Sequence, residues 1–415
     1  MDPTRRRALV NAAVAAGLTL MVGLAVVATV SGGGGGGGVQ SPSSSPPPSS
    51  PASPASPGPA KAVTPDAYLV WVPQGLPKDF AAGAANLPQI DRVTSVLQDN
   101  VWMNRSTDAT GTVVDAPAPY AIPIDAAGIE PARFASFLPQ PYRKTVAALG
   151  PNEGILSETS ATLRRLGVGG SLTFAGGTVK IVAVLPDVLV GAQELVVDAP
   201  TARAIGVTHA RYLIMRAAKG SAPTDDQLRA ELLPLLPAGL QYPVIQIRAP
   251  GETTYLRSAD LVLPQENIKQ RFGEWAGRPS VGRPGFLEID PKWVGANIVT
   301  TTVPILGRVT CNRRLIPPLK TAMRQLVSQG QSSAVHDYEG CFVAKFLLND
   351  PSASISHHAW GAAVDINAAE NPYGAIPTQS PVLVKAMERQ GFIWGGRFII
   401  PDGHHFEYLR PAGKA

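Results

Sequence analysis

The sequence is poor in the features that mark several large classes of protein. Only two cysteines and six histidines occur in 415 residues, and aromatic residues make up 6% of the chain. The 36 lysines and arginines exceed the 31 aspartates and glutamates by only five, and no basic run follows the arginines at positions 5–7. Nucleic-acid binding is therefore not expected, because it needs a concentrated basic surface. The mild excess of positive charge suits an anionic polymer of the cell envelope as a partner.

The N-terminal segment is almost uninterruptedly apolar over residues 12–30, about the length of a membrane-spanning helix. With arginines before it, it predicts a cytoplasmic stub and a single transmembrane helix within 1–30, and an extracytoplasmic position for everything that follows. A cleaved signal peptide is the alternative, and Thr4-Arg5-Arg6 faintly resembles a twin-arginine signal. Residues 31–62 are rich in glycine, serine and proline, which predicts a disordered linker.

The two cysteines, Cys311 and Cys341, both lie in the part of the chain expected outside the membrane. An even pair in that environment is typically bridged, so we predict a disulfide between them. The alternative is two buried thiols.

Residues 63–255 are expected to form an α+β domain. A strand is predicted at 68–72, a helix at 78–85 and a further short helix after Ser157, while two β-rich runs at 171–174 and 179–185 flank Gly176-Gly177 and predict a hairpin. The sequence of residues 156–187 resembles the extracytoplasmic domain of MacB- and FtsX-type permeases; it reads LSETSATLRRLGVGGSLTFAGGTVKIVAVLPD. The chain lacks the later membrane helices of such permeases, so this resemblance implies a spacer or a module that binds a protein partner.

Residues 256–415 predict a second α+β domain. Apolar residues recur at helical spacing from 315 to 327, and a second helix is expected between Ser380 and Gly391. Strand-like stretches at 340–346, around His358, and at 364–367, 391–396 and 405–408 predict a small antiparallel sheet.

Four of the six histidines fall in two short stretches, Ser356 to Asp365 and Asp402 to Glu407. Together these stretches supply imidazoles and carboxylates, the groups that form a catalytic zinc site with three protein ligands and one open position. A carboxylate beside a zinc-activated water acts as a general base in amide hydrolysis. Asp402, three residues before His405, is close enough along the chain to face the same ion.

Several assignments stay open on the residues alone. His357 and His404 each adjoin a proposed ligand, although on an alternating strand they would face away. Glu407 is an alternative to Asp402 as the general base, or it supports an imidazole ligand by a hydrogen bond to the ring nitrogen that does not bind the metal. Ser356 either binds substrate or satisfies the backbone at the end of a strand.

The pattern Ser356-x-His358-x-x-Gly361-x-Ala363-x-Asp365, with later Trp394-Gly395-Gly396 and Asp402-x-x-His405-Phe406-Glu407, closely resembles the M15 family of zinc D-alanyl-D-alanine carboxypeptidases and L-alanyl-D-glutamate endopeptidases. The resemblance covers about residues 290–415. It implies that His358, Asp365 and His405 bind Zn²⁺ and that Asp402 is the base. Lys345 stands where the family commonly has an arginine that steadies the oxyanion, so the charge is kept but the bidentate fork is lost.

We therefore expect a membrane-anchored zinc peptidase that cleaves peptidoglycan stem peptides. The alternative is a non-catalytic protein of envelope binding or assembly that uses the same fold. Presence of both the ligand set and the base favours the enzyme, whereas Lys345 and the large middle region leave room for the alternative.

Overall fold

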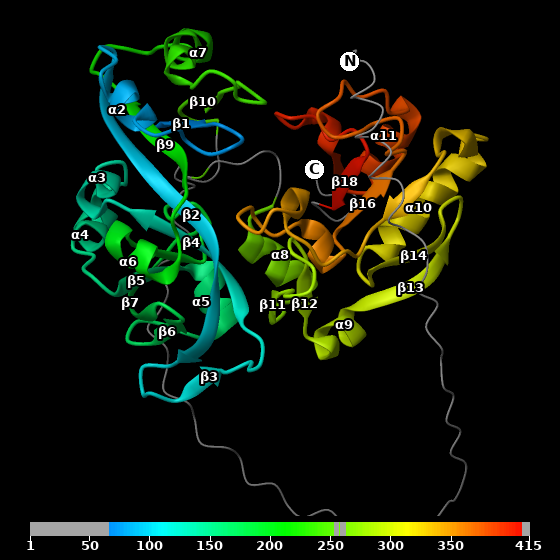
Figure 1. Ribbon diagram of the computed structural model, residues 1–415, viewed down its shortest axis with the longest axis horizontal. Coiled ribbons are helices and arrows are strands. Elements are labelled where there is room, and N and C mark those ends of the chain that lie inside the picture. The colour runs from blue at the N-terminus through cyan, green and yellow to red at the C-terminus, as the bar shows by residue number, and fades with distance from the viewer. Residues whose placement is uncertain (1–65, 253–256, 258–262, 409–415) are drawn as a thin grey trace, which may run out of the picture. The chain divides into compact units, whose positions relative to one another are not determined.

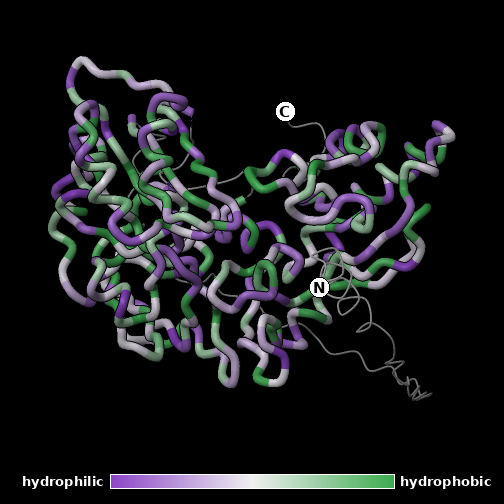
Figure 2. The backbone as a smooth tube through the Cα atoms, turned by 45° about the horizontal axis from the view of Figure 1, so that its top comes forward, coloured by the Kyte–Doolittle hydropathy of each residue, from purple (hydrophilic) through white to green (hydrophobic). Residues whose placement is uncertain are grey.

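The computed structural model describes residues 66–252, 257 and 263–408 (Figure 1). These residues form an α+β fold, as the sequence predicted. One part of the expected fold class is corrected: in the described ranges no helix is both long and apolar enough to cross a bilayer. In Figure 2, polar and apolar stretches alternate closely along the described part of the chain. The predicted membrane helix within 1–30 and the linker at 31–62 lie outside the described residues.

The middle region is built on a ten-stranded mixed sheet. Its strands are β1 (Tyr68–Trp71), β2 (Ile90–Thr107), β3 (Val113–Asp115), β4 (Ile122–Ile129), β5 (Glu153–Ser157), β6 (Ser171–Phe174), β7 (Gly177–Leu185), β8 (Leu195–Asp198), β9 (Ala210–Ala217) and β10 (Gln246–Arg248). The long strand β2 pairs with β9, β4 and β6 in turn, so that β2, β4, β8, β5, β7 and β6 close a ring.

Short helices cover this sheet. They are α2 (Phe80–Ala85), α3 (Pro131–Ala135), α4 (Gln140–Ala147), α5 (Glu158–Arg164), α6 (Ala199–Ile205), α7 (Asp225–Leu232) and the 3₁₀ turn η1 (Leu233–Leu235). Gly128 on β4 lets α6 approach closely, because a Cβ at this position would lie 2.4 Å from the Cβ of Ala202. The predicted strand at 68–72, the helix at 78–85, the helix after Ser157 and the 171–185 hairpin are confirmed as β1, α2, α5 and β6–β7.

A buried cluster of charges ties helix α8 (Gln265–Phe272) to this sheet. Arg164 pairs with Glu194, and Lys269 of α8 lies 2.8 Å from Glu194 and 3.0 Å from Glu274. Burial alone would raise the pKa of Glu274, but Arg164 and Lys269 hold it at about 2. Sequence reasoning found no such cluster, because its members lie far apart in the chain and meet only in the fold.

The C-terminal region contains a four-stranded antiparallel sheet in the order β15-β16-β18-β17 and two hairpins. The elements are β11 (Gly277–Pro279), β12 (Leu287–Ile289), α9 (Pro291–Asn297), β13 (Ile298–Val303), β14 (Gly307–Asn312), α10 (Ile316–Ser328), η2 (Ser332–Ala334), β15 (Tyr338–Gly340), η3 (Leu347–Asn349), η4 (His357–Trp360), β16 (Ala363–Ile366), α11 (Pro381–Arg389), β17 (Phe392–Trp394), η5 (Gly395–Arg397) and β18 (His405–Tyr408).

Helices α10 and α11 bury their apolar faces in one core with strands β14, β16 and β18. Both helices were predicted, and both are confirmed. The strand predicted at 340–346 is wrong over most of its length, since β15 ends at Gly340 and the chain then runs irregularly toward η3. The sheet and this irregular segment surround the site described next.

Candidate metal centre

Two of the predicted ligands lie side by side on neighbouring strands. Asp365 of β16 is the cross-strand partner of His405 of β18. Cross-strand partners project from the same face of a sheet, with Cβ atoms about 5 Å apart. The antiparallel register alone therefore brings the carboxylate and the imidazole together, although 40 residues separate them in the chain.

The third ligand, His358, is carried by the 3₁₀ turn η4 and not by a strand, so that part of the sequence prediction was wrong. Ser356 begins the turn, because its Oγ accepts a hydrogen bond from the His358 backbone N–H (3.3 Å). Gly361 ends it at φ +62°, where a Cβ would lie 2.5 Å from the backbone nitrogen of Asn312. Only glycine therefore fits there.

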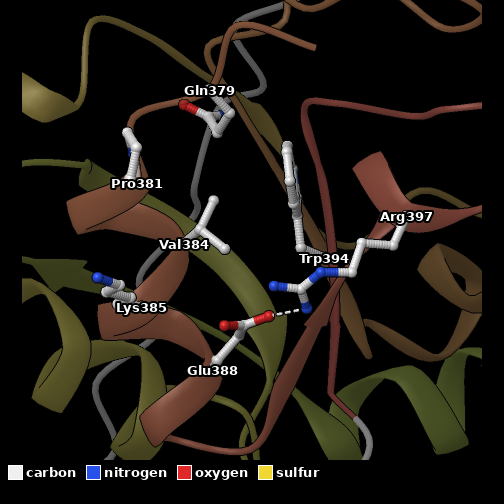
Figure 3. Close-up of a pocket in the computed structure, with 7 residues that line it drawn as sticks. All are labelled: Gln379, Pro381, Val384, Lys385, Glu388, Trp394 and Arg397. Carbon is white, nitrogen blue, oxygen red and sulfur yellow. Dashed lines mark hydrogen bonds and ion pairs between the residues drawn. The ribbon is translucent and has the colours of Figure 1, made fainter. Parts of the chain in front are cut away.

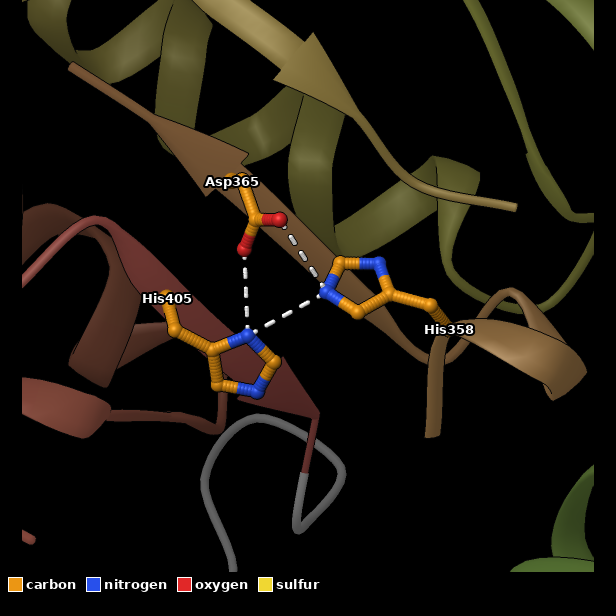
Figure 4. Close-up of side chains that lie close together, drawn as sticks. All are labelled: His358, Asp365 and His405. Carbon is orange, nitrogen blue, oxygen red and sulfur yellow. Dashed lines mark hydrogen bonds and ion pairs between the residues drawn. The ribbon is translucent and has the colours of Figure 1, made fainter. Parts of the chain in front are cut away.

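The three side chains converge, with one ligand atom of each lying within 4.8 Å of the others (Figure 4). His358 Nε2 lies 3.2 Å from His405 Nδ1 and 3.2 Å from Asp365 Oδ2, and His405 Nδ1 lies 3.1 Å from Asp365 Oδ1. Ligands about 2.0–2.1 Å from a tetrahedral zinc ion are separated by roughly 3.3 Å. Two imidazoles and one carboxylate at these separations fit such an ion.

Each imidazole has a partner on the side that faces away from the cluster. His358 Nδ1 donates to the backbone carbonyl of Cys341 (2.8 Å), which leaves Nε2 as the ring nitrogen that faces the cluster and can bind a metal. His405 Nε2 lies 3.6 Å from Glu407, whose other oxygen pairs with His357. Such outer partners fix the tautomer and the orientation of a metal-binding histidine. Glu407, buried at 2% exposure, thus occupies the supporting position and does not face the open side of the cluster.

The charges of the cluster are strongly coupled. Burial alone would raise the pKa of Asp365, but His358 and His405 hold it well below its usual range. Burial alone would lower the pKa of His405, but hydrogen bonds to Asp365 and Glu407 raise it to about 10. Burial opposes the charged form of Glu407 as well, yet His357 and His405 lower its pKa to about 2. The carboxylates therefore stabilise positive charge at the place where a bound cation would take over from protons.

The neighbouring histidines point elsewhere. His404 Nδ1 donates to the backbone carbonyl of Asn371 (2.7 Å), and His357 is engaged with Glu407, so neither belongs to the ligand cluster. Asp402 Oδ1 lies 3.1 Å from His404 Nδ1, and the charge of Asp402 contributes to the raised pKa of His405. The structure places Asp402 beside the cluster without making it a member.

Lys345 and Ser356 adjoin the cluster through the backbone. The Ser356 N–H donates to the Lys345 carbonyl (3.1 Å), so both residues stand at the entrance to the His358 turn. Within the described residues the Lys345 side chain makes no hydrogen bond or ion pair, and its charge lowers the pKa of Glu339, which burial and Asp337 raise. The roles predicted for Lys345 and for Ser356 as a substrate ligand stay predictions.

The loop that carries Asp402 and His405 is held by a polar network that sequence reasoning missed. The carbonyl of Gly403 accepts hydrogen bonds from Trp394 Nε1 (2.8 Å) and from Gln379 Nε2 (3.2 Å). Gln379 in turn accepts from Asn367 Nδ2 (2.7 Å). The backbone of Asn367 has a φ of +60°, which is typical of a turn, but its side chain is buried and hydrogen-bonded.

A cavity of about 220 Å³ lies beside Trp394 (Figure 3). It is lined by Gln379, Pro381, Val384, Lys385, Glu388, Trp394 and Arg397. Arg397 and Glu388 form an ion pair along one side. None of the three metal-binding candidates lines the cavity, so it is separate from the cluster.

A comparison with known protein families agrees with the resemblance of the C-terminal region. A family model described as D-alanyl-D-alanine carboxypeptidase matches residues 350–408, the stretch that contains His358, Asp365 and His405. The M15 resemblance is confirmed over these residues. No curated protein matches the chain.

Three solved structures are similar to the chain. The periplasmic region of MacB from Actinobacillus actinomycetemcomitans matches with a TM-score of 0.30 and 13% identity, over 44% of this chain and 88% of that one. The extracellular domain of the noncanonic ABC-type transporter YknZ from Gram-positive bacteria gives 0.27 and 15%, over 41% and 91%. A domain of a putative permease from Porphyromonas gingivalis gives 0.28 and 16%, over 46% and 92%.

Proposed function

We propose that this protein is a zinc-dependent peptidase that cleaves peptidoglycan stem peptides, as a D-alanyl-D-alanine carboxypeptidase or an L-alanyl-D-glutamate endopeptidase. The observation that carries the proposal is the convergence of His358, Asp365 and His405, whose ligand atoms lie 3.1–3.2 Å apart. Three ligands of this kind with a base nearby are the minimum that hydrolytic zinc chemistry requires. The match of residues 350–408 to a carboxypeptidase family model supports the same conclusion.

The residues divide the work as follows. His358, Asp365 and His405 hold the ion, which when bound polarises the scissile carbonyl and acidifies water. Asp402 accepts the proton of the attacking water on a carboxylate oxygen and passes it to the amine that leaves. Lys345, whose ammonium has no ion-pair partner in the described part of the chain, balances the negative charge that develops on the carbonyl oxygen.

The substrate class and the place of action rest on weaker support. A chain of net charge +5 suits the acidic groups of stem peptides. The Cys311–Cys341 disulfide is typical of an oxidising, extracytoplasmic compartment. We propose that the middle region, with its permease-like hairpin, serves there as a spacer or binds a protein partner.

The test is cleavage of defined stem peptides by the purified chain loaded with zinc. Mass spectrometry of a pentapeptide ending in D-alanyl-D-alanine, and of a muropeptide with an intact L-alanyl-D-glutamate bond, identifies which bond is cut. We expect one of the two bonds to be hydrolysed, and the activity to disappear with a chelator and return with zinc. A folded, zinc-loaded chain that cleaves neither would refute the proposal and favour a non-catalytic envelope protein.

A further inference from the structure

Hydrogen bonds from two different segments hold the turn that carries His358. On one side, the segment that follows β15 makes two hydrogen bonds to the ligand residue itself. His358 Nδ1 donates to the Cys341 carbonyl (2.8 Å), and the Val343 N–H donates to the His358 carbonyl (3.1 Å). The first of these bonds determines which ring nitrogen is free for a metal, and the second fixes the backbone of the ligand.

On the other side, the end of β14 forms hydrogen bonds to Trp360 and Gly361, which follow His358 in the chain. The backbone N–H of Asn312 donates to the Gly361 carbonyl (3.2 Å), and its side-chain Nδ2 donates to the Trp360 carbonyl (3.1 Å). Asn312 is fully buried, so neither bond competes with solvent. The close approach at Gly361, where a Cβ would lie 2.5 Å from the Asn312 nitrogen, leaves this side of the turn little freedom to shift.

A disulfide bond joins the end of β14 to the segment that follows β15. Cys311, next to Asn312, is bridged to Cys341, whose carbonyl holds His358, and their Cα atoms are 5.3 Å apart. Both cysteines are buried, and Cys341 Sγ lies 3.5 Å from the Gly361 carbonyl, in contact with the turn. Besides the disulfide, the Phe342 N–H donates to the Thr310 carbonyl (2.9 Å). The disulfide thus connects the two segments that hold His358, in addition to joining residues 30 positions apart in the chain.

We propose that the Cys311–Cys341 disulfide is a positioning element of the metal site, which keeps the Cys341 carbonyl in place to select the Nδ1–H tautomer of His358. This inference rests on the ligand set of the proposed function but not on peptide cleavage. Opening the bridge frees the Cys341 carbonyl to move, so His358 samples both tautomers and both ring orientations. Loss of such an outer partner typically weakens metal binding 10- to 100-fold. By linkage, bound zinc makes the disulfide harder to reduce by the same factor.

The experiment compares zinc affinity in the oxidised wild type and in Cys311→Ala/Cys341→Ala, by competition with a chromophoric chelator. Removing a disulfide also lowers global stability, so Met323→Ala serves as the matched control. Met323 is fully buried in the same core on α10, outside the turn that carries His358, so its truncation lowers global stability and leaves the turn intact. We expect a 10- to 100-fold loss of affinity in the double variant and wild-type affinity in the control. Equal affinity of the folded double variant and the wild type would overturn the proposal.

A second measurement needs no metal and no substrate. The hydrogen-exchange rate of the His358 Nδ1–H, followed by ¹⁵N NMR in the metal-free chain, reports its hydrogen bond to the Cys341 carbonyl directly. We expect a slowly exchanging Nδ1–H in the oxidised protein and fast exchange in the double variant or after reduction with a dithiol, which supplies the two electrons that convert the bridge to two thiols. Unchanged exchange would overturn the proposal even if the chain bound no zinc, whereas a chain that binds zinc but cleaves nothing would refute only the proposed peptidase.

Discussion

The substitution Glu407→Gln tests the support behind His405. Glu407 is buried between His357 and His405, and these two residues lower its pKa from the ordinary 4.5 to about 2. A shift of that size corresponds to about 3 kcal/mol of stability in the metal-free protein at neutral pH. Because the pKa is lower in the folded state than in the unfolded state, this contribution is complete above about pH 4.5 and is lost as the pH falls toward 2. Glutamine keeps the shape and removes the charge.

Urea denaturation of the chelator-treated protein at pH 7 measures the effect, and we expect Glu407→Gln to lower the free energy of unfolding by up to about 3 kcal/mol. In zinc titrations the same variant should bind 10- to 100-fold more weakly. The matched control is Glu370→Gln, which breaks another glutamate–histidine pair (2.7 Å to His336) whose side chains are about half exposed. Exposed pairs contribute at most about 1 kcal/mol. If Glu407→Gln cost no more than the control, the reasoning from burial and charge would be wrong.

Three further predictions concern the roles of single residues. His405→Ala should remove most of the bound zinc while His404→Ala keeps it, because only His405 lies in the cluster; elemental analysis that found full zinc in His405→Ala would contradict the ligand assignment. Asp402→Asn should retain zinc and slow stem-peptide cleavage by about 10² or more, and near-normal turnover would exclude Asp402 as the base. Burial raises the pKa of Glu266 to about 8, so the folded protein holds a proton that the unfolded chain releases near pH 4.5. The free energy of unfolding should therefore fall between about pH 4.5 and 8, by up to about 1.4 kcal/mol per pH unit. Thermal melts of Glu266→Gln should show a flatter dependence over that window, and an unchanged slope would show that another group titrates.

The candidate ligands were predictable because they lie within short motifs whose residue types alone indicate metal binding. His358 and Asp365 lie within one short motif, and His405 lies in another, so each stretch shows its residue types without knowledge of the fold. The conformation of the first motif was not predictable in the same way. Ser356 caps a 3₁₀ turn and Gly361 adopts a left-handed conformation, and this combination overrides the strand-like composition around His358. The cysteine pair was predicted from compartment alone and is confirmed.

What the sequence did not predict depends on partners that meet only in the folded chain. The link from Gln379 to the Gly403 carbonyl joins residues 24 positions apart and holds the loop that carries Asp402. Neither residue has a feature that distinguishes it from an ordinary loop residue. The closure of the ring through β2 and β6 is similar, since alternating buried and polar residues can indicate a strand but do not select which strands pair.

The buried charges around α8 have a consequence for the order in which the chain folds. Arg164 of α5 and Glu194, just before β8, already pair within the middle region, and Lys269 and Glu274 pair in the segment that arrives later during synthesis. None of these four charges therefore has to be buried alone while one region waits for the other, which would be a severe penalty. The middle region can form first on the nascent chain and receive α8 with both of these pairs already made.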